Sequence, residues 1–78
     1  MAVDDRKRVY HLPTNGDTIT GRFMVQAFHC SGAVTVKNGA GEIIWVTTAE
    51  SSIQFPDGLQ VTNIEKDAGA GELYVYVR

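Results

Sequence analysis

Glycine and proline recur so closely along this chain of 78 residues that few windows are long enough for a helix. Between them lie short runs rich in valine, isoleucine, threonine, tyrosine and phenylalanine, the residues that favour strands. The glycines and prolines that separate these runs are Pro13, Gly16, Gly21, Gly32, Gly39, Gly41, Pro56, Gly58, Gly69 and Gly71. The spacing predicts an all-β fold.

The strand-like runs are residues 8–12, 18–20, 22–30, 33–37, 42–48, 52–55, 59–65 and 72–78. Several alternate apolar and polar side chains, as in the last run, where Leu73, Val75 and Val77 share one face. We therefore predict a single small antiparallel β-sandwich, jelly-roll-like, of seven to eight short strands over residues 8–78. Residues 1–7, which carry Asp4-Asp5 before Arg6-Lys7, are expected to be a solvated N-terminal arm.

Composition narrows the class of partner. A net charge of −2, without a basic cluster beyond residues 6–8, argues against nucleic acid or an anionic membrane. The lone Cys30 cannot form an intramolecular disulfide, and we find no signal peptide or membrane span, so synthesis in the cytoplasm is expected. A domain of this size buries only about 60–65% of its unfolded surface, so oligomerisation is a common source of added stability.

Two runs carry more apolar side chains than one interior can hold. Residues 23–28 and 43–46 are apolar on both faces, and the final strand adds two tyrosines outside its inner face. A two-layer sandwich has one interior, so a loop, the N-terminal segment or another subunit must cover the second faces. We favour a subunit interface or docking surface, because exposed apolar patches mark interaction sites. Its candidate residues are Met24, Phe28, Trp45, Tyr74 and Tyr76.

No arrangement of reactive residues predicts catalysis. His29 and Cys30 are neighbours in a strand and should point to opposite faces, and with the distant His11 they lack the spacing of a zinc site. The acidic residues mostly fall in turns or at strand ends, and the glycines match neither a phosphate-binding loop nor a dinucleotide fingerprint. We therefore expect no enzyme activity, no metal and no cofactor.

The order of motifs from residue 22 to residue 78 resembles that of short β-sandwich structural proteins of tailed bacteriophages. The resemblance is carried by residues 28–39, by a strand that ends near Thr48, by the phrase Ile53-Gln54-Phe55-Pro56-Asp57-Gly58-Leu59-Gln60-Val61, and by the closing Leu73-Tyr74-Val75-Tyr76-Val77. Residues 1–21 lie outside the pattern.

The resemblance implies a non-enzymatic virion component, made in the host cytoplasm. It would be a capsid decoration or cement subunit, or a small head–tail or tail accessory subunit. Its expected partners are other copies of itself, most plausibly in a trimer, and the major capsid protein or another virion protein. Two alternatives stay open from the residues alone. One is a small module that binds carbohydrate on Trp45 and the tyrosines, and the other is a barrel that binds single-stranded nucleic acid.

Overall fold

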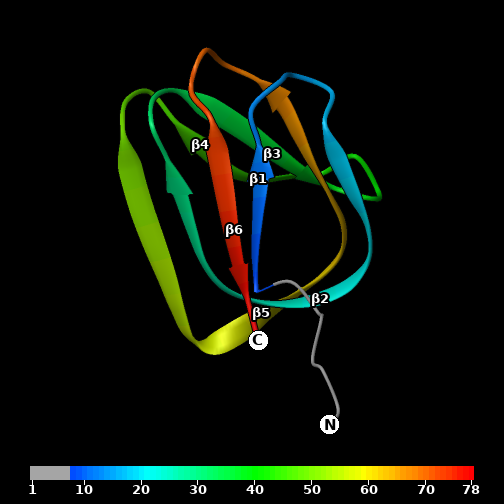
Figure 1. Ribbon diagram of the computed structural model, residues 1–78. Coiled ribbons are helices and arrows are strands. Elements are labelled where there is room, and N and C mark those ends of the chain that lie inside the picture. The colour runs from blue at the N-terminus through cyan, green and yellow to red at the C-terminus, as the bar shows by residue number, and fades with distance from the viewer. Residues whose placement is uncertain (1–7) are drawn as a thin grey trace, which may run out of the picture.

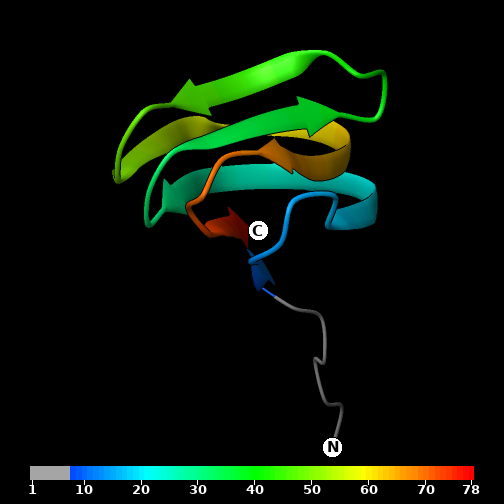
Figure 2. The same ribbon diagram turned by 90° about the horizontal axis from the view of Figure 1, so that it is seen from above.

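The computed structural model describes residues 8–78, which form six β-strands in one antiparallel sheet (Figure 1). The strands follow the order β1-β6-β2-β5-β3-β4 across the sheet, so β1 and β4 are its two edges (Figure 2). Their bounds are β1 Val9–Leu12, β2 Thr18–Cys30, β3 Val34–Asn38, β4 Ile43–Thr47, β5 Ser51–Ala68 and β6 Leu73–Val77. The all-β prediction is confirmed, and the predicted arm of residues 1–7 lies outside the described residues.

The strand count differs from the prediction because two glycines bend strands that they were expected to end. β2 runs unbroken through Gly21, and β5 runs unbroken through Pro56 and Gly58. Both glycines have positive φ, 133° at Gly21 and 81° at Gly58, and both lie where the register between β2 and β5 shifts. The eight predicted runs therefore give six strands in an open sheet, and two separate sheets of a seven- to eight-stranded sandwich are not seen.

The two long strands curve and thereby turn the sheet around one interior (Figures 1 and 2). The second half of β2 pairs with β6 and with the first half of β5. The second half of β5 pairs instead with the first half of β2 and with β3. The bulges between these halves bend the strands and increase their twist.

The core lies on the inner face of the curved sheet. Its largest ring, Phe28, is fully buried and stacks on Trp45 of β4 with ring centroids 5.4 Å apart. Phe55 of β5 meets the same ring edge-on at 5.7 Å, so an aromatic cluster joins β2, β4 and β5. The buried apolar residues are Leu12, Val25, Phe28, Cys30, Val34, Val36, Val61, Ile64, Leu73, Val75 and Val77.

Candidate functional site

The most exposed large apolar side chains lie on the edge strand β4. Ile43 is 60% exposed and Val46 is 54% exposed. Within residues 8–78, β4 pairs with β3 on one side and has no strand on its other side. The strand reads Ile-Ile-Trp-Val-Thr, without a charge or a proline. Proteins usually protect such edges with charges, prolines or bulges, because an unpaired apolar strand is a template for pairing with another chain. β4 has a bulge at Ile44 but neither a charge nor a proline to oppose pairing.

A bulge explains why β4 is apolar on both faces. Val36 of β3 lies opposite Trp45, but the next residue, Lys37, lies opposite Ile43, so Ile44 is the extra residue. Ile44 and Trp45, although consecutive, both pack against the core cluster. Ile43 and Val46 on either side of them remain outside. The bulge therefore turns a run of four apolar residues into two that face the core and two that are exposed.

A groove runs beside β4 where the sheet is open. It has a volume of about 740 Å³ and lies between the β3–β4 hairpin and the middle of β5. Its apolar lining comes from Ile44, Phe55, Leu59 and Val61, and its rim from polar groups near Asn63. Asn63 has a φ of 56° and accepts a 2.8 Å hydrogen bond from Gly21 N, which fixes the local bend of β5 against β2. Ile44, which packs towards the core, is the β4 residue that lines the groove.

A row of aromatic rings crosses the outer face of the sheet from β1 to β5. The row consists of His11, Tyr74 and His29 and ends at Ser52; we call it the outer aromatic row. The His11 and Tyr74 rings are stacked at 4.6 Å with 3° between their planes, and the His29 ring lies 5.9 Å from Tyr74. A 2.6 Å hydrogen bond joins His29 Nδ1 and Ser52 Oγ. Such cross-strand pairs hold neighbouring strands in register.

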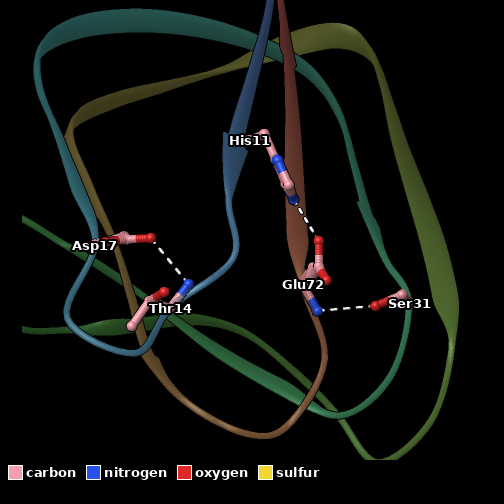
Figure 3. Close-up of polar contacts among 5 residues, drawn as sticks. All are labelled: His11, Thr14, Asp17, Ser31 and Glu72. Atoms are coloured by element: carbon pink, nitrogen blue, oxygen red, sulfur yellow. Dashed lines mark hydrogen bonds and ion pairs between the residues drawn. The ribbon is translucent and has the colours of Figure 1, made fainter.

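Polar contacts fix one end of the outer aromatic row (Figure 3). His11 donates from Nε2 to Glu72 Oε1, and Glu72 N donates a 2.9 Å hydrogen bond to Ser31 Oγ. Nearby, Thr14 N donates to Asp17 Oδ2 at 2.9 Å and closes the turn that follows β1. These contacts tie the edge strand β1 to the start of β6 and to the turn after β2. The row is thus a structural brace for the β1 side of the sheet.

The five predicted interface residues do not form one surface. Met24 and Tyr76 are each 37% exposed on the outer face. Tyr74 is half-buried between the two histidines, and Trp45 is half-buried with its ring on the core side. Phe28 is fully buried, so it does not lie on the outer face with Met24. The structure instead adds Ile43 and Val46, which the prediction did not include.

The position of Phe28 follows from a bulge in β2. Val25 lies opposite Val77 of β6 and Ala27 lies opposite the adjacent Tyr76, so Gln26 is the extra residue on β2. Val25 and Phe28 are both buried, although they are three residues apart, whereas strict alternation would place them on opposite faces. The bulge reverses the alternation between Met24 and Phe28. It places one outside and the other in the core.

Cys30 and the histidines take the ordinary positions expected for them. Cys30 is fully buried at the end of β2, with its Sγ 3.3 Å from Thr47 Oγ1. His29, its neighbour, lies in the outer aromatic row on the opposite face. Across residues 8–78, no three His, Cys, Asp or Glu side chains gather closely enough to hold one metal ion. The same residues include no helix with the length and apolar character needed to cross a bilayer.

A buried lysine was not foreseen from the sequence. Lys66 is 1% exposed, and its Nζ donates to Asn15 Oδ1 and, at 2.9 Å, to the Gly69 carbonyl oxygen. Its backbone holds the same turn, since Lys66 N donates to Asp17 O at 3.0 Å and Gly16 N donates to Lys66 O at 2.8 Å. Lys66 therefore joins the turn after β1 to the end of β5. No pattern in the sequence separates this lysine from an exposed one.

Replacing Asn15 with alanine should lower the free energy of unfolding by about 1–3 kcal/mol, because it removes an acceptor from a buried ammonium group. Urea unfolding followed by circular dichroism measures the loss. In Lys66→Met the group that needs the acceptor is gone, so adding Asn15→Ala to that variant should cost much less. Equal costs of Asn15→Ala in both backgrounds would show that the contact does not matter.

Comparisons of this chain with protein-family models, with curated proteins and with solved structures found no match.

Proposed function

We propose that this chain is a non-enzymatic structural subunit that assembles with other copies of itself through the β4 edge. The observation that carries the proposal is an uncharged apolar strand at the edge of the sheet, with Ile43 and Val46 exposed. Edge strands bind partners by adding a strand, in which main-chain hydrogen bonds give affinity and side chains give specificity. A second exposed patch, Val9 beside Tyr76 on neighbouring strands, lies at the other side of the sheet.

We propose a virion as the setting of this assembly, with the chain as a capsid decoration or cement subunit of a tailed bacteriophage. The resemblance of residues 22–78 to phage structural proteins supports this setting, and the major capsid protein is the expected partner. The braced outer face suits the role, because a subunit that coats a surface needs a rigid sheet more than a pocket. A trimer remains the predicted oligomer.

A sugar or a nucleic-acid base would need the open face of an aromatic ring. The Trp45 ring stacks on Phe28 with 20° between the planes. Tyr74 has His11 stacked on it and His29 beside it. These two rings are engaged within the chain itself and leave only Tyr76, 37% exposed, as an open ring among the residues proposed to bind sugar, so we favour a protein partner.

Co-sedimentation with capsids tests the proposed setting. We expect the gene to lie among capsid, portal or protease genes, and the purified chain to sediment with capsids assembled from the neighbouring major capsid protein. Bovine serum albumin in the same tubes controls for trapping. Genes unrelated to a virion, or a chain that stays in the supernatant at saturating capsid, would contradict the virion proposal.

A further inference from the structure

The two edges of the sheet lie on opposite sides of the molecule. Figure 2 shows β4 at one end of the stack of strands and β1 at the other. In the described part of the chain each of these strands has one neighbour, β3 for β4 and β6 for β1. Each therefore offers a row of backbone groups to a further strand. One copy of the chain has two such edges to offer.

The strand directions make these two edges complementary. Every neighbouring pair in the sheet is antiparallel, and the sheet has six strands, so β1 and β4 have opposite senses in the alternation. The twist of the sheet also turns β4 across β1 (Figures 1 and 2). A second copy beyond β1, rotated to follow the twist of the sheet, can add its β4 antiparallel to β1 and continue the alternation. A pairing of β4 with β4 would instead require a two-fold rotation between the copies.

Side chains on the two edges match face by face. On β1, Val9 is 43% exposed on the outer face beside Tyr76, and Tyr10 packs against the core cluster. On β4, Val46 is exposed on the outer face and Trp45 packs against the core. An antiparallel register with Val9 opposite Val46 also sets Tyr10 opposite Trp45. Aromatic and β-branched cross-strand pairs of this kind are among the more stabilising ones.

Charge also favours the unlike pairing. Glu42 directly precedes β4 and Glu50 lies three residues after its end, and both are exposed. A symmetric antiparallel pairing of β4 with β4 centred on Val46 would set Glu42 of one copy opposite Glu50 of the other, twice. Like charges directly opposite each other are destabilising. In the register with Val9 opposite Val46, Arg8 lies opposite Thr47 and Pro13 opposite Glu42, so Glu42 meets no carboxylate on the β1 side.

We propose that β4 of one copy pairs antiparallel with β1 of a second copy, head to tail, with Val9 opposite Val46 of the partner copy. The proposal deepens the proposed structural role and rests on it for the need to self-associate. The junction joins the two sheets and brings the exposed side chains Tyr76, Val9 and Val46 together on one outer face. A head-to-tail contact of this type repeats, and it gives a closed ring or a filament according to the rotation between copies.

Disulfide trapping tests the junction directly. Val9→Cys and Val46→Cys are made in separate chains, because opposite residues of an antiparallel pair bring their Cβ atoms within disulfide reach. We expect the mixture of the two variants to give disulfide-linked dimers under mild oxidation, and neither variant alone to do so. Gln26→Cys, exposed on a central strand, is the matched control and should not cross-link with either variant.

A disulfide-linked dimer formed by Val46→Cys without the other variant would overturn the proposal in favour of a β4–β4 junction. A mixture without dimers would overturn the β1–β4 junction altogether. Neither result depends on a virion, and capsid binding does not depend on this register, so the two proposals fail separately.

Discussion

Replacing Phe28 with alanine should lower the free energy of unfolding by about 3–5 kcal/mol, the range for truncation of a buried phenylalanine. Phe28 is fully buried and contacts both Trp45 and Phe55, so the truncation leaves a cavity where β2, β4 and β5 meet. A domain of this length has a total stability of about 4–12 kcal/mol, so the variant loses a large share of it. Urea unfolding followed by far-ultraviolet circular dichroism, at one protein concentration, gives the difference.

Met24→Ala is the matched control, since Met24 is on the same strand and is 37% exposed on the outer face. We expect it to cost less than about 1 kcal/mol, as surface substitutions usually do. The contrast depends on the bulge at Gln26, which separates the faces of the two residues. Similar losses of unfolding free energy in the two variants would mean that β2 alternates strictly and has no bulge at Gln26.

Replacing Gly69 with alanine should lower the stability by more than about 4 kcal/mol, among the largest effects of a single substitution. Gly69 has a φ of 104° and lies in the turn between β5 and β6. A methyl group there would overlap the Ala33 carbonyl oxygen, which accepts a 2.9 Å hydrogen bond from Gly71 N. The carbonyl oxygen of Gly69 also accepts a hydrogen bond from Lys66 Nζ. Thermal unfolding followed by circular dichroism reports the loss.

Gly16→Ala separates the clash from backbone strain. Gly16 has a similar φ of 95°, but a methyl group there would meet no atom within 4 Å. We expect it to cost only the roughly 1–2 kcal/mol of an unfavourable backbone conformation. If Gly69→Ala cost no more than Gly16→Ala, the close approach of the β5–β6 turn to Ala33 would be refuted.

Alternation within single strands was the part of the fold that the sequence could predict. Leu73, Val75 and Val77 are buried as expected, and so are Val34 and Val36. These strands are short and regular, so a period of two places each side chain correctly. The all-β class followed from the same patterns and from the frequent turn residues.

Bulges account for most of what the sequence did not predict. A single inserted residue, at Gln26 in β2 or at Ile44 in β4, moves every later side chain of that strand to the other face of the sheet. No residue type in the sequence predicts such an insertion. That is why Phe28 is in the core and why Ile43 and Val46 took the place of Trp45 on the surface. Gly21 and Gly58 were unpredictable for a similar reason, because a glycine bends a strand in one context and ends it in another.

Contacts between distant strands needed the strand order. The outer aromatic row forms because β6 lies between β1 and β2, which sets His11, Tyr74 and His29 side by side. The edge position of β4 has the same origin, and it is the feature on which the proposed function depends. Neither could be derived from a strand pattern that carries no pairing information.

Sedimentation velocity of the wild-type chain beside Val46→Lys tests most directly whether the β4 edge drives assembly. A lysine on an edge strand opposes pairing with another chain. The account predicts that the wild type sediments as an oligomer, that Val46→Lys sediments as the 8.5 kDa monomer, and that Gln26→Lys, on a central strand, behaves as the wild type. A wild type that stays monomeric at every concentration, or a Val46→Lys variant that assembles as the wild type does, would contradict it.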